Sequence, residues 1–270
     1  MRTASTRPTR EPELHVTTYT ETFDQRGHLY NGAMATFPGA RDEELRQLLN
    51  RLDPQPGEVI VDAPAGGGFV AEALAAAGAE AICIEPSTPF GRPLAARFKT
   101  HVAPICHMPL ADHSVDKLAS LAGLHHLGHA ELQGFFNEAF RVLRPGGFIA
   151  VADVRADTPT AAFLNGPVDT WTGTGHDGHF FPPGGLQDQL ERAGFQHTTE
   201  TLESFFWTLP DTTSLCRFVH DLFGLVKLPS AETEALLREG PGIHEDAAGA
   251  HLPWALAYAT ARKSTGTPAS

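Results

Sequence analysis

The chain has few basic residues and no long apolar run. Its 270 residues include 20 Lys and Arg against 32 Asp and Glu, which gives a formal net charge of -12, and Lys and Arg never form a run. This balance argues against DNA or RNA as a partner, because their phosphates are bound mainly by Lys and Arg. No apolar stretch approaches the roughly 20 residues that span a bilayer, which argues against a membrane partner. We therefore expect a soluble protein.

Cysteine is also scarce. Cys83, Cys106 and Cys216 are widely spaced, and two of them lie in or beside apolar runs. Reduced, buried thiols are typical of proteins from reducing compartments. The N-terminal sequence has basic residues but lacks the apolar core of a secretory signal. These features predict a cytoplasmic protein.

Length and composition predict a single domain. Hydrophobic residues make up 41% of the chain, which suffices for a sizeable core, and no internal repeat occurs. Residues 1–15 and 264–270 are polar segments that contain Pro and Thr. We expect both to be disordered tails around one domain at 16–263.

The rest of the chain is organised around Glu58–Glu85. In order, this stretch predicts a buried strand, a Gly-rich turn, an Ala-rich helix ended by glycine and a second strand, at Val59–Asp62, Ala63–Gly68, Phe69–Ala77 and Ala81–Ile84. An acidic residue ends or follows each strand. Because the carboxyl ends of parallel strands share one edge of a sheet, both acids are expected at one ligand-binding edge.

Such a unit suits a nucleoside. Glu85 can accept both ribose hydroxyls, and glycines let the backbone approach a ligand closely. The dinucleotide pattern G-x-G-x-x-G is not met, because Gly66, Gly67 and Gly68 are consecutive, and no phosphate-binding loop with Lys and Ser or Thr is present. An ordinary strand–helix–strand unit is the alternative for this stretch taken alone.

Four motifs in sequence order resemble the class I S-adenosylmethionine-dependent methyltransferases. The turn D-A-P-A-G-G-G at 62–68 is similar to their D-x-G-x-G-x-G, with Pro64 in place of the first glycine, and Glu85 follows in the second motif. The segment M-P-L-A-D-H-S-V-D at 108–116 resembles their L-P-F-x-D-x-S-F-D. Finally, H-H-L at 125–127 and E-A-F-R-V-L-R-P-G-G-F at 138–148 look like the corresponding part of the family.

The resemblance implies a Rossmann-like α/β fold, with a seven-stranded, mostly parallel sheet, helices on both faces and an antiparallel edge strand. It also implies S-adenosylmethionine as the cofactor, with Glu85 on the ribose and Asp112 facing the adenine amino group. The cofactor-binding residues implied in this way are Tyr30, Asp62, Ala63, Pro64, Gly66, Gly68, Glu85, Pro86, Asp112, Leu121 and His126.

The family usually joins its last two strands by a short turn, whereas this chain inserts residues 211–253. The remaining expected strands lie at 102–106, 117–121, 148–154, 195–209 and 254–262, and the main expected helices at 42–51, 94–99, 130–143, 185–193, 213–224 and 231–239. One helix of the insertion carries an apolar stripe, which needs a partner surface. We predict that the insertion caps the substrate, and a homodimer contact is the alternative.

Methyl transfer requires a positioned acceptor and, where the acceptor is protic, a base, for which histidine is suited near neutral pH. Among 14 histidines, His126 lies at the end of the fourth strand, beside the expected sulfonium. His176 and His179 lie in the loop after the fifth strand, which commonly faces the acceptor. These three histidines are the catalytic candidates.

A zinc or iron site is the alternative for H-D-G-H at 176–179. His101, His107 or His113 could supply a third ligand, but the spacing is weak and neither C-x-x-C nor H-E-x-x-H accompanies it. We therefore assign no metal.

The resemblance implies methyl transfer to an oxygen, nitrogen or carbon atom of a small-molecule acceptor, such as a specialised metabolite. A protein that binds S-adenosylmethionine without methyl transfer, in a regulatory or other role, is the alternative. The intact set of Asp62, Gly66, Gly68, Glu85 and Asp112 favours the enzyme. No Asn-Pro-Pro-Tyr motif follows the fourth strand, which argues against nucleic-acid and protein acceptors.

Overall fold

The computed structural model describes residues 19–176 and 178–265. The expected N-terminal tail and the last five residues of the expected C-terminal tail lie outside the described residues. None of the helices in the described part combines the length and the apolar character that crossing a membrane requires.

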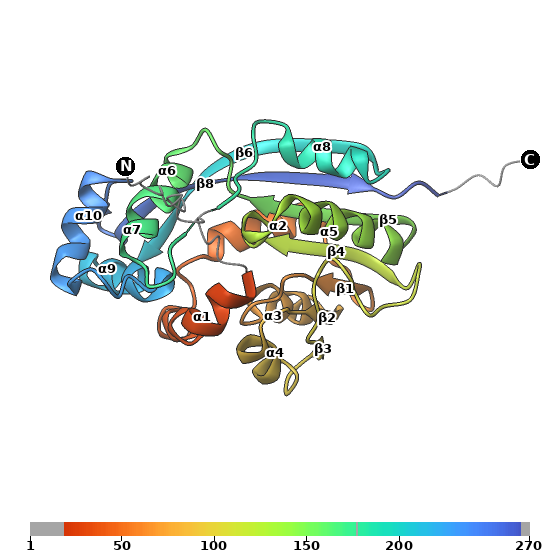
Figure 1. Cartoon of the computed structure of the whole chain (residues 1–270), viewed down its shortest axis with the longest axis horizontal. Coiled ribbons are helices and arrows are strands. Elements are labelled where there is room, and N and C mark those ends of the chain that lie inside the picture. Colours follow the sequence, from red (N-terminus) through yellow and green to blue (C-terminus); the bar gives the residue numbers. More distant parts are fainter. Residues whose placement is uncertain (1–18, 177, 266–270) are drawn as a thin grey trace, which may run out of the picture.

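A mixed sheet forms the centre of the fold (Figure 1). In the described residues it has eight strands in the order β3-β2-β1-β4-β5-β8-β6, with the short β7 paired to β8. The strands are β1 (Val59–Asp62), β2 (Glu80–Ile84), β3 (Lys99–His101), β4 (Val115–Leu121), β5 (Leu143–Asp153), β6 (Gln196–Leu209), β7 (His244–Asp246) and β8 (Gly249–Arg262). β1 to β5 pair in parallel, whereas β8 is antiparallel to both β5 and β6. The predicted fold class is confirmed, and β7 is an additional strand within the insertion.

Helices lie on both faces of the sheet and at one end of it. They are α1 (Tyr19–Thr36), α2 (Asp42–Leu52), α3 (Phe69–Ala76), α4 (Thr88–Leu94), α5 (His129–Val142), α6 (Pro159–Phe163), α7 (Asp169–Trp171), α8 (Gly185–Arg192), α9 (Thr212–Phe223) and α10 (Thr233–Glu239). α2 and α3 pack on one face, and α5 and α8 pack on the other. Figure 1 shows α6, α7, α9 and α10 gathered at one end of the sheet, with α1 beside them. These end helices cover the carboxyl ends of the parallel strands, where a ligand is expected.

Side-chain size differs between the two faces. Successive residues of a strand point to opposite faces, so β4 and β5 place Ala119, Ala150 and Ala152 on one side and Leu, Ile and Val on the other. The small side chains leave room for Leu48 and Leu52 of α2, which are buried against them. The sheet and α2 are thereby held closely together.

Two predictions near the second strand were wrong. The prolines at 86–93 were expected to delay the helix until about residue 94, but α4 already begins at Thr88. Pro89 lies in the first turn, where a proline costs no helical hydrogen bond because that amide has no partner within the helix. Because α4 begins and ends earlier, β3 also lies earlier, at Lys99–His101 rather than 102–106.

The insertion packs onto its own domain. α9 buries the apolar stripe of Leu215, Phe218, Val219 and Leu222, and it contacts α1, β6 and β8. The rings of Phe37 and Phe218 meet edge to face at 6.1 Å. The stripe therefore has a partner surface within this chain.

Candidate active site

The Gly-rich turn joins β1 to α3 at the carboxyl edge of the sheet. Gly66 and Gly68 have positive φ angles of 51° and 92°, in the region that glycine adopts readily. A Cβ on Gly67 would lie 2.3 Å from Oδ1 of Asn31, so α1 packs directly on the turn. At Gly66 a Cβ would meet nothing within 4 Å. The turn therefore offers bare backbone to open space at Gly66 and a close helix contact at Gly67.

Glu85 is fully buried directly after β2. Its Oε2 accepts hydrogen bonds from the Gly66 amide at 2.7 Å and from the Tyr19 hydroxyl at 3.1 Å, and its Oε1 accepts from the Ser87 amide at 2.7 Å. Burial raises the pKa of Glu85 to about 7. The carboxyl is thus held firmly, and the hydroxyl of Tyr19 already takes one of its acceptor positions.

Asp62 has one paired and one unpaired oxygen. Oδ2 accepts a hydrogen bond from the Ala71 amide at 3.1 Å, whereas Oδ1 is buried without a partner among the described residues. Burial raises the pKa of Asp62 to about 8, and the nearby Glu85 adds to this rise. A buried polar atom without a partner is costly unless a ligand or water bonds to it. Asp62 also lines a cavity, so a ligand there could supply that bond.

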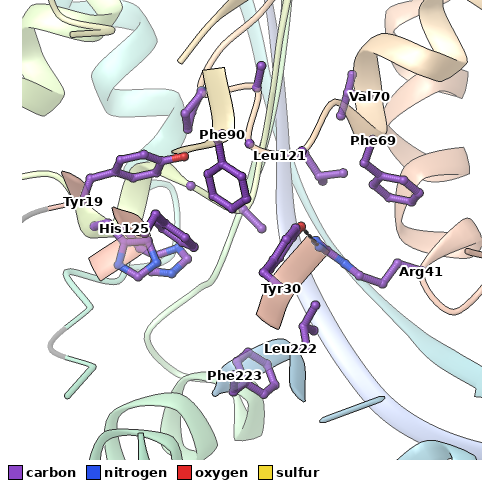
Figure 2. A pocket seen from close by; sticks show the side chains of 18 of the residues that line it. Tyr19, Tyr30, Arg41, Phe69, Val70, Phe90, Leu121, His125, Leu222 and Phe223 are labelled. Atoms are coloured by element: carbon purple, nitrogen blue, oxygen red, sulfur yellow. Dashed lines mark hydrogen bonds between the residues drawn. The ribbon is translucent and has the colours of Figure 1, made fainter. Parts of the chain in front are cut away.

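The cavity has a volume of about 100 Å³. Figure 2 shows Tyr19, Phe90 and Tyr30 around it, with Arg41 bonded to Tyr30 and Phe223 reaching it from α9. Small-molecule sites usually measure about 300–1,000 Å³, so a nucleoside cofactor needs more room than this conformation provides. Tyr19 and Phe23 of α1 pack ring to ring at 4.6 Å, and Phe23 meets Phe90 at 5.5 Å. A shift of α1 is therefore the direct way to widen the cavity.

A buried network supports the cavity lining from Tyr30 to Trp207. Arg41 forms an ion pair with Glu44 and donates a hydrogen bond to the Tyr30 hydroxyl. The indole of Trp207 donates to Oε2 of Glu44 at 2.8 Å, and the Tyr258 hydroxyl donates to its backbone carbonyl at 3.0 Å. Because every charge in this group has a partner, the network ties α1, α2, β6 and β8 together.

Aromatic rings form the far wall. Trp207 of β6 and Trp254 of β8 stack with ring centroids 4.2 Å apart and an interplanar angle of 25°. Phe223 of α9 stacks on this pair, with its ring centroid 6.0 Å from that of Trp254. All three rings line the cavity, which gives it a flat aromatic surface.

Histidines gather where β4 and β5 end. Nδ1 of His125 bonds Oδ1 of Asp153 at 2.6 Å. The ring of His126 meets that of Phe23 edge to face at 5.2 Å, and His176 lies 5.1 Å from His126 between centroids. Burial lowers the pKa of His126 and of His176 well below 6.5, and His125 adds to both effects. Both imidazoles are therefore neutral at pH 7.

The cavity brings together about half of the predicted residues. Those that line it are Tyr30, Asp62, Pro64, Gly66, Leu121, His126 and His176. Ala63, Gly68, Glu85 and Pro86 do not line it. His179 is exposed, and its backbone amide donates to the His125 carbonyl at 2.8 Å. The ring of His179 is therefore not brought to the cavity.

Asp112 is not brought to the cavity either. It lies in the turn before β4, where 66% of its side chain is exposed and Oδ1 bonds Nη1 of Arg141 at 2.7 Å. The hydrogen bond from Arg141 lowers the pKa of Asp112. The physical reason is the direction of β4, because a residue just before the strand lies at its amino end, opposite the ligand edge. The structure thus does not support contact between Asp112 and adenine.

The sequence prediction missed the first turns of α1. Tyr19, Phe23 and Arg26 line the cavity together with the predicted Tyr30. They are spaced i, i+4, i+7 and i+11, which is one face of a helix, and this spacing could have found them. The tryptophans of the far wall carry no comparable signal, because strand pairing brings them together.

Residues 61–151 match a family model described as a methyltransferase domain. A demethylmenaquinone methyltransferase of Corynebacterium urealyticum is 31% identical over 136 residues, which are 48% of this chain and 57% of that protein. The chain thus spans little more than half of that relative.

Two solved structures share the fold. One is an S-adenosylmethionine-dependent methyltransferase of Thermotoga maritima, described as a possible histamine N-methyltransferase, with a TM-score of 0.63 and 18% identity over 91% of this chain and 99% of that one. The other is the 1,6-didemethyltoxoflavin-N1-methyltransferase of Burkholderia thailandensis with its substrate and S-adenosylhomocysteine bound. Its TM-score is 0.53 at 18% identity, over 96% of this chain and 93% of that one.

Proposed function

Because the chain contains a class I S-adenosylmethionine-dependent methyltransferase domain, we propose that it methylates an oxygen, nitrogen or carbon atom of a small molecule. One observation carries this proposal. A single cavity is lined by Asp62 and Gly66 of the nucleoside edge, by three histidines and by two tryptophans. A cofactor and an acceptor could therefore meet within one enclosed space.

The residues at the nucleoside edge suit the cofactor. When bound, S-adenosylmethionine supplies a methyl group on a sulfonium. Glu85 would accept the ribose hydroxyls, and Gly66 leaves room for a close approach. Tyr19 would have to release Glu85, which requires α1 to move away from the turn. A cover that opens for ligands and closes over them also excludes water from the reacting groups.

The far wall favours a flat acceptor. Trp207, Phe223 and Trp254 present stacked rings, which bind planar ring systems by offset stacking. Relatives named for demethylmenaquinone and 1,6-didemethyltoxoflavin support a small-molecule acceptor of this class. The insertion was predicted at 211–253, but β8 already begins at Gly249, so it spans 210–248. It serves as a cap in this proposal, because α9 supplies Leu222 and Phe223 to the cavity.

A protic acceptor also requires a base. His126 and His176 line the same cavity, and each is neutral at pH 7, so either could take a proton. His179 is not included as a base in this proposal, because its side chain is exposed. We include a cytoplasmic location in the proposal, because Cys83, Cys106 and Cys216 are all unpaired.

Binding and turnover test the proposal in two steps. Titration with S-adenosylmethionine and S-adenosylhomocysteine should show saturable binding. Protein loaded with methyl-deuterated S-adenosylmethionine, incubated with phenols, quinols and heteroaromatic amines, should release S-adenosylhomocysteine and a deuterium-labelled product that mass spectrometry identifies. Absence of saturable binding at millimolar ligand would refute the proposal. Conversion of an acceptor while the cofactor stays intact would favour the non-methylating alternative.

A further inference from the structure

Three histidines from two segments form a compact cluster beside the cavity. His125 and His126 lie in the short 3-10 turn after β4, and His176 lies in the loop between α7 and α8. One ring nitrogen from each lies within 4.8 Å of those from the other two. We propose that this cluster binds a divalent transition-metal ion, of the class of Zn²⁺ or Fe²⁺, through three imidazoles.

The cluster differs from the zinc or iron site that the H-D-G-H motif at 176–179 suggested. The H-D-G-H spacing pairs His176 with His179, but the side chain of His179 is exposed. The structure instead pairs His176 with two histidines that precede it by about fifty positions in the chain. Sequence spacing could not indicate this set, because packing of the loop against the end of β4 creates it.

Hydrogen bonds select the ligating nitrogen of His125. Its Nδ1 lies 2.6 Å from Oδ1 of Asp153, and that carboxyl group also accepts from the backbone amides of Leu124, His125 and Val154. Nδ1 of His125 therefore donates, and Nε2 carries the free lone pair. In metal sites, a ligating histidine usually donates its other ring N–H to a carboxylate in this way, which fixes the orientation of the ring.

The side-chain amide of Asn165 selects the ligating nitrogen of His176. Asn165 donates through Nδ2 to the Gly178 carbonyl at 2.9 Å and accepts through Oδ1 from the Gly178 amide at 2.9 Å. These two bonds fix which end of the amide is oxygen. The same Oδ1 lies 3.1 Å from Nδ1 of His176, so Nδ1 must donate and Nε2 is left to ligate. Two of the three imidazoles thus have Nδ1 engaged, which leaves Nε2 as the nitrogen available to a metal.

The third ligand and the open position complete the arrangement. His126 forms no side-chain hydrogen bond among the described residues, which leaves its ring free. Zinc held at 2.0–2.1 Å by three imidazoles in a tetrahedron places their nitrogens roughly 3.3 Å apart, so nitrogens that now lie within 4.8 Å of one another have to approach by up to about 1.5 Å. All three rings line the cavity, so the fourth position faces the space that a ligand would enter.

Arg26 limits what that fourth position takes. It lines the same cavity, and Nη1 donates to the Phe223 carbonyl at 3.1 Å, but no carboxylate pairs with it in the described part of the chain. A metal ion and a guanidinium on one cavity wall repel each other unless an anion lies between them. The open position therefore suits an anionic donor atom, such as a phenolate or carboxylate oxygen.

This proposal does not rest on methyl transfer. A bound ion would occupy the nitrogens of His126 and His176 that a base would use, so the two roles exclude each other. Metal titration without cofactor decides between them. Titration with S-adenosylmethionine tests the nucleoside edge separately, so either proposal can fail alone.

The test uses the full chain after treatment with a chelator. Titration with Co²⁺, followed by its visible absorption, and competition with Zn²⁺ should show one equivalent bound. His176→Ala should abolish this site, and Asp153→Asn should weaken it roughly 10–100-fold. His179→Ala is the matched control, because it lies in the same loop with an exposed side chain. Its affinity should equal that of the wild type.

Two results would overturn the proposal. One is the absence of saturable binding to the folded wild type, which would leave a cluster of neutral imidazoles. The other is binding that His176→Ala and His126→Gln retain, which would place the ion on surface histidines. Circular dichroism verifies that each variant is folded. If His176→Ala does not fold, the volume-matched His176→Gln takes its place.

Discussion

Two regions enclose the cavity: the nucleoside edge, formed by β1, α3 and β2, and the cover, formed by α1 and α9. They are built in different ways. The edge comes from one contiguous stretch, in which β1, the turn, α3 and β2 place Asp62, Gly66 and Glu85 within 24 residues of one another. The cover joins distant segments, as when Arg26 of α1 bonds the Phe223 carbonyl 197 positions away. Backbone hydrogen bonds and glycine conformation define the edge, whereas side-chain packing defines the cover.

The two regions also differ in chemistry. The edge buries two carboxyl groups whose pKa values are raised, which is unfavourable once they ionise. The cover buries aromatic rings, whose removal from water stabilises the fold. The cover thus stabilises the fold, whereas the ionised carboxyl groups of the edge destabilise it. Four variants test this contrast.

The largest effect is expected for Asp62→Asn. Burial raises the pKa of Asp62 from 3.8 to about 8, so the folded state favours the protonated form. Stability that is present below pH 4 is therefore lost as the pH rises toward 8, by up to about 5 kcal/mol. Asn cannot ionise, so the variant should become increasingly more stable than the wild type as the pH rises across this range.

Urea unfolding at pH 4.5 and pH 8.5 measures this effect. The exposed Asp53→Asn is the control, and its difference from the wild type should change little with pH. An Asp62→Asn difference that is the same at both pH values would show that Asp62 ionises as an ordinary surface carboxyl does.

Glu85→Ala should weaken the cofactor's binding by about 1.5–3 kcal/mol, or roughly 10–100-fold, because hydrogen bonds to a charged acceptor have this value. Glu80→Ala on the same strand is the matched control, since its side chain is 59% exposed. Calorimetry with S-adenosylhomocysteine compares the two variants. Equal affinities would mean that the ribose binds elsewhere.

Tyr19→Phe should have the opposite effect on the affinity for the cofactor. Its hydroxyl occupies an oxygen of Glu85 that the ribose needs, so removing it should tighten binding by about 0.5–1.5 kcal/mol, the net value of one hydrogen bond. The same change made in Glu85→Ala should have no effect on affinity. Weaker binding of the ligand by Tyr19→Phe would instead identify Tyr19 as part of the bound site.

The contrast between the regions explains how far the sequence could predict them. Strand, turn and helix signals lie within neighbouring residues, so the β1–α3–β2 unit follows from periodicity and glycine position, whereas the resemblance to methyltransferases implied the mostly parallel sheet. The resemblance misplaced Asp112, because a motif shows the order of residues along the chain but not the end of the strand at which each lies. His176 could be predicted to face the acceptor only because its loop follows β5.

Long-range packing is what the sequence could not show. Trp207 and Trp254 meet because β6 and β8 pair in one register among several that their lengths allow. His176 meets His125 because Asn165 and Asp169 hold its loop. Neither contact leaves a pattern in neighbouring residues, so each required the folded chain.

The smallest effect is expected for Pro64→Gly. A proline fixes φ near -65° and has no amide hydrogen, so the turn cannot donate a hydrogen bond at this position. Glycine restores a donor beside the expected methionine end of the cofactor, while Gly66 and Glu85 remain in place. Binding of S-adenosylmethionine should be equal or tighter, by less than about 1 kcal/mol.

A second position tests whether Pro64 acts through packing. A Cβ on Gly123 would lie 2.5 Å from Cγ of Pro64, so Gly123→Ala should destabilise the wild type. The clash disappears in the Pro64→Gly background, where Gly123→Ala should be tolerated. Titrating the wild type and Pro64→Gly with S-adenosylmethionine and with S-adenosylhomocysteine then distinguishes an effect of Pro64 on packing from an effect on ligand affinity. If the wild type shows no saturable binding at millimolar concentration and Pro64→Gly restores it, then Pro64 has closed the edge to the cofactor, and the non-methylating alternative holds.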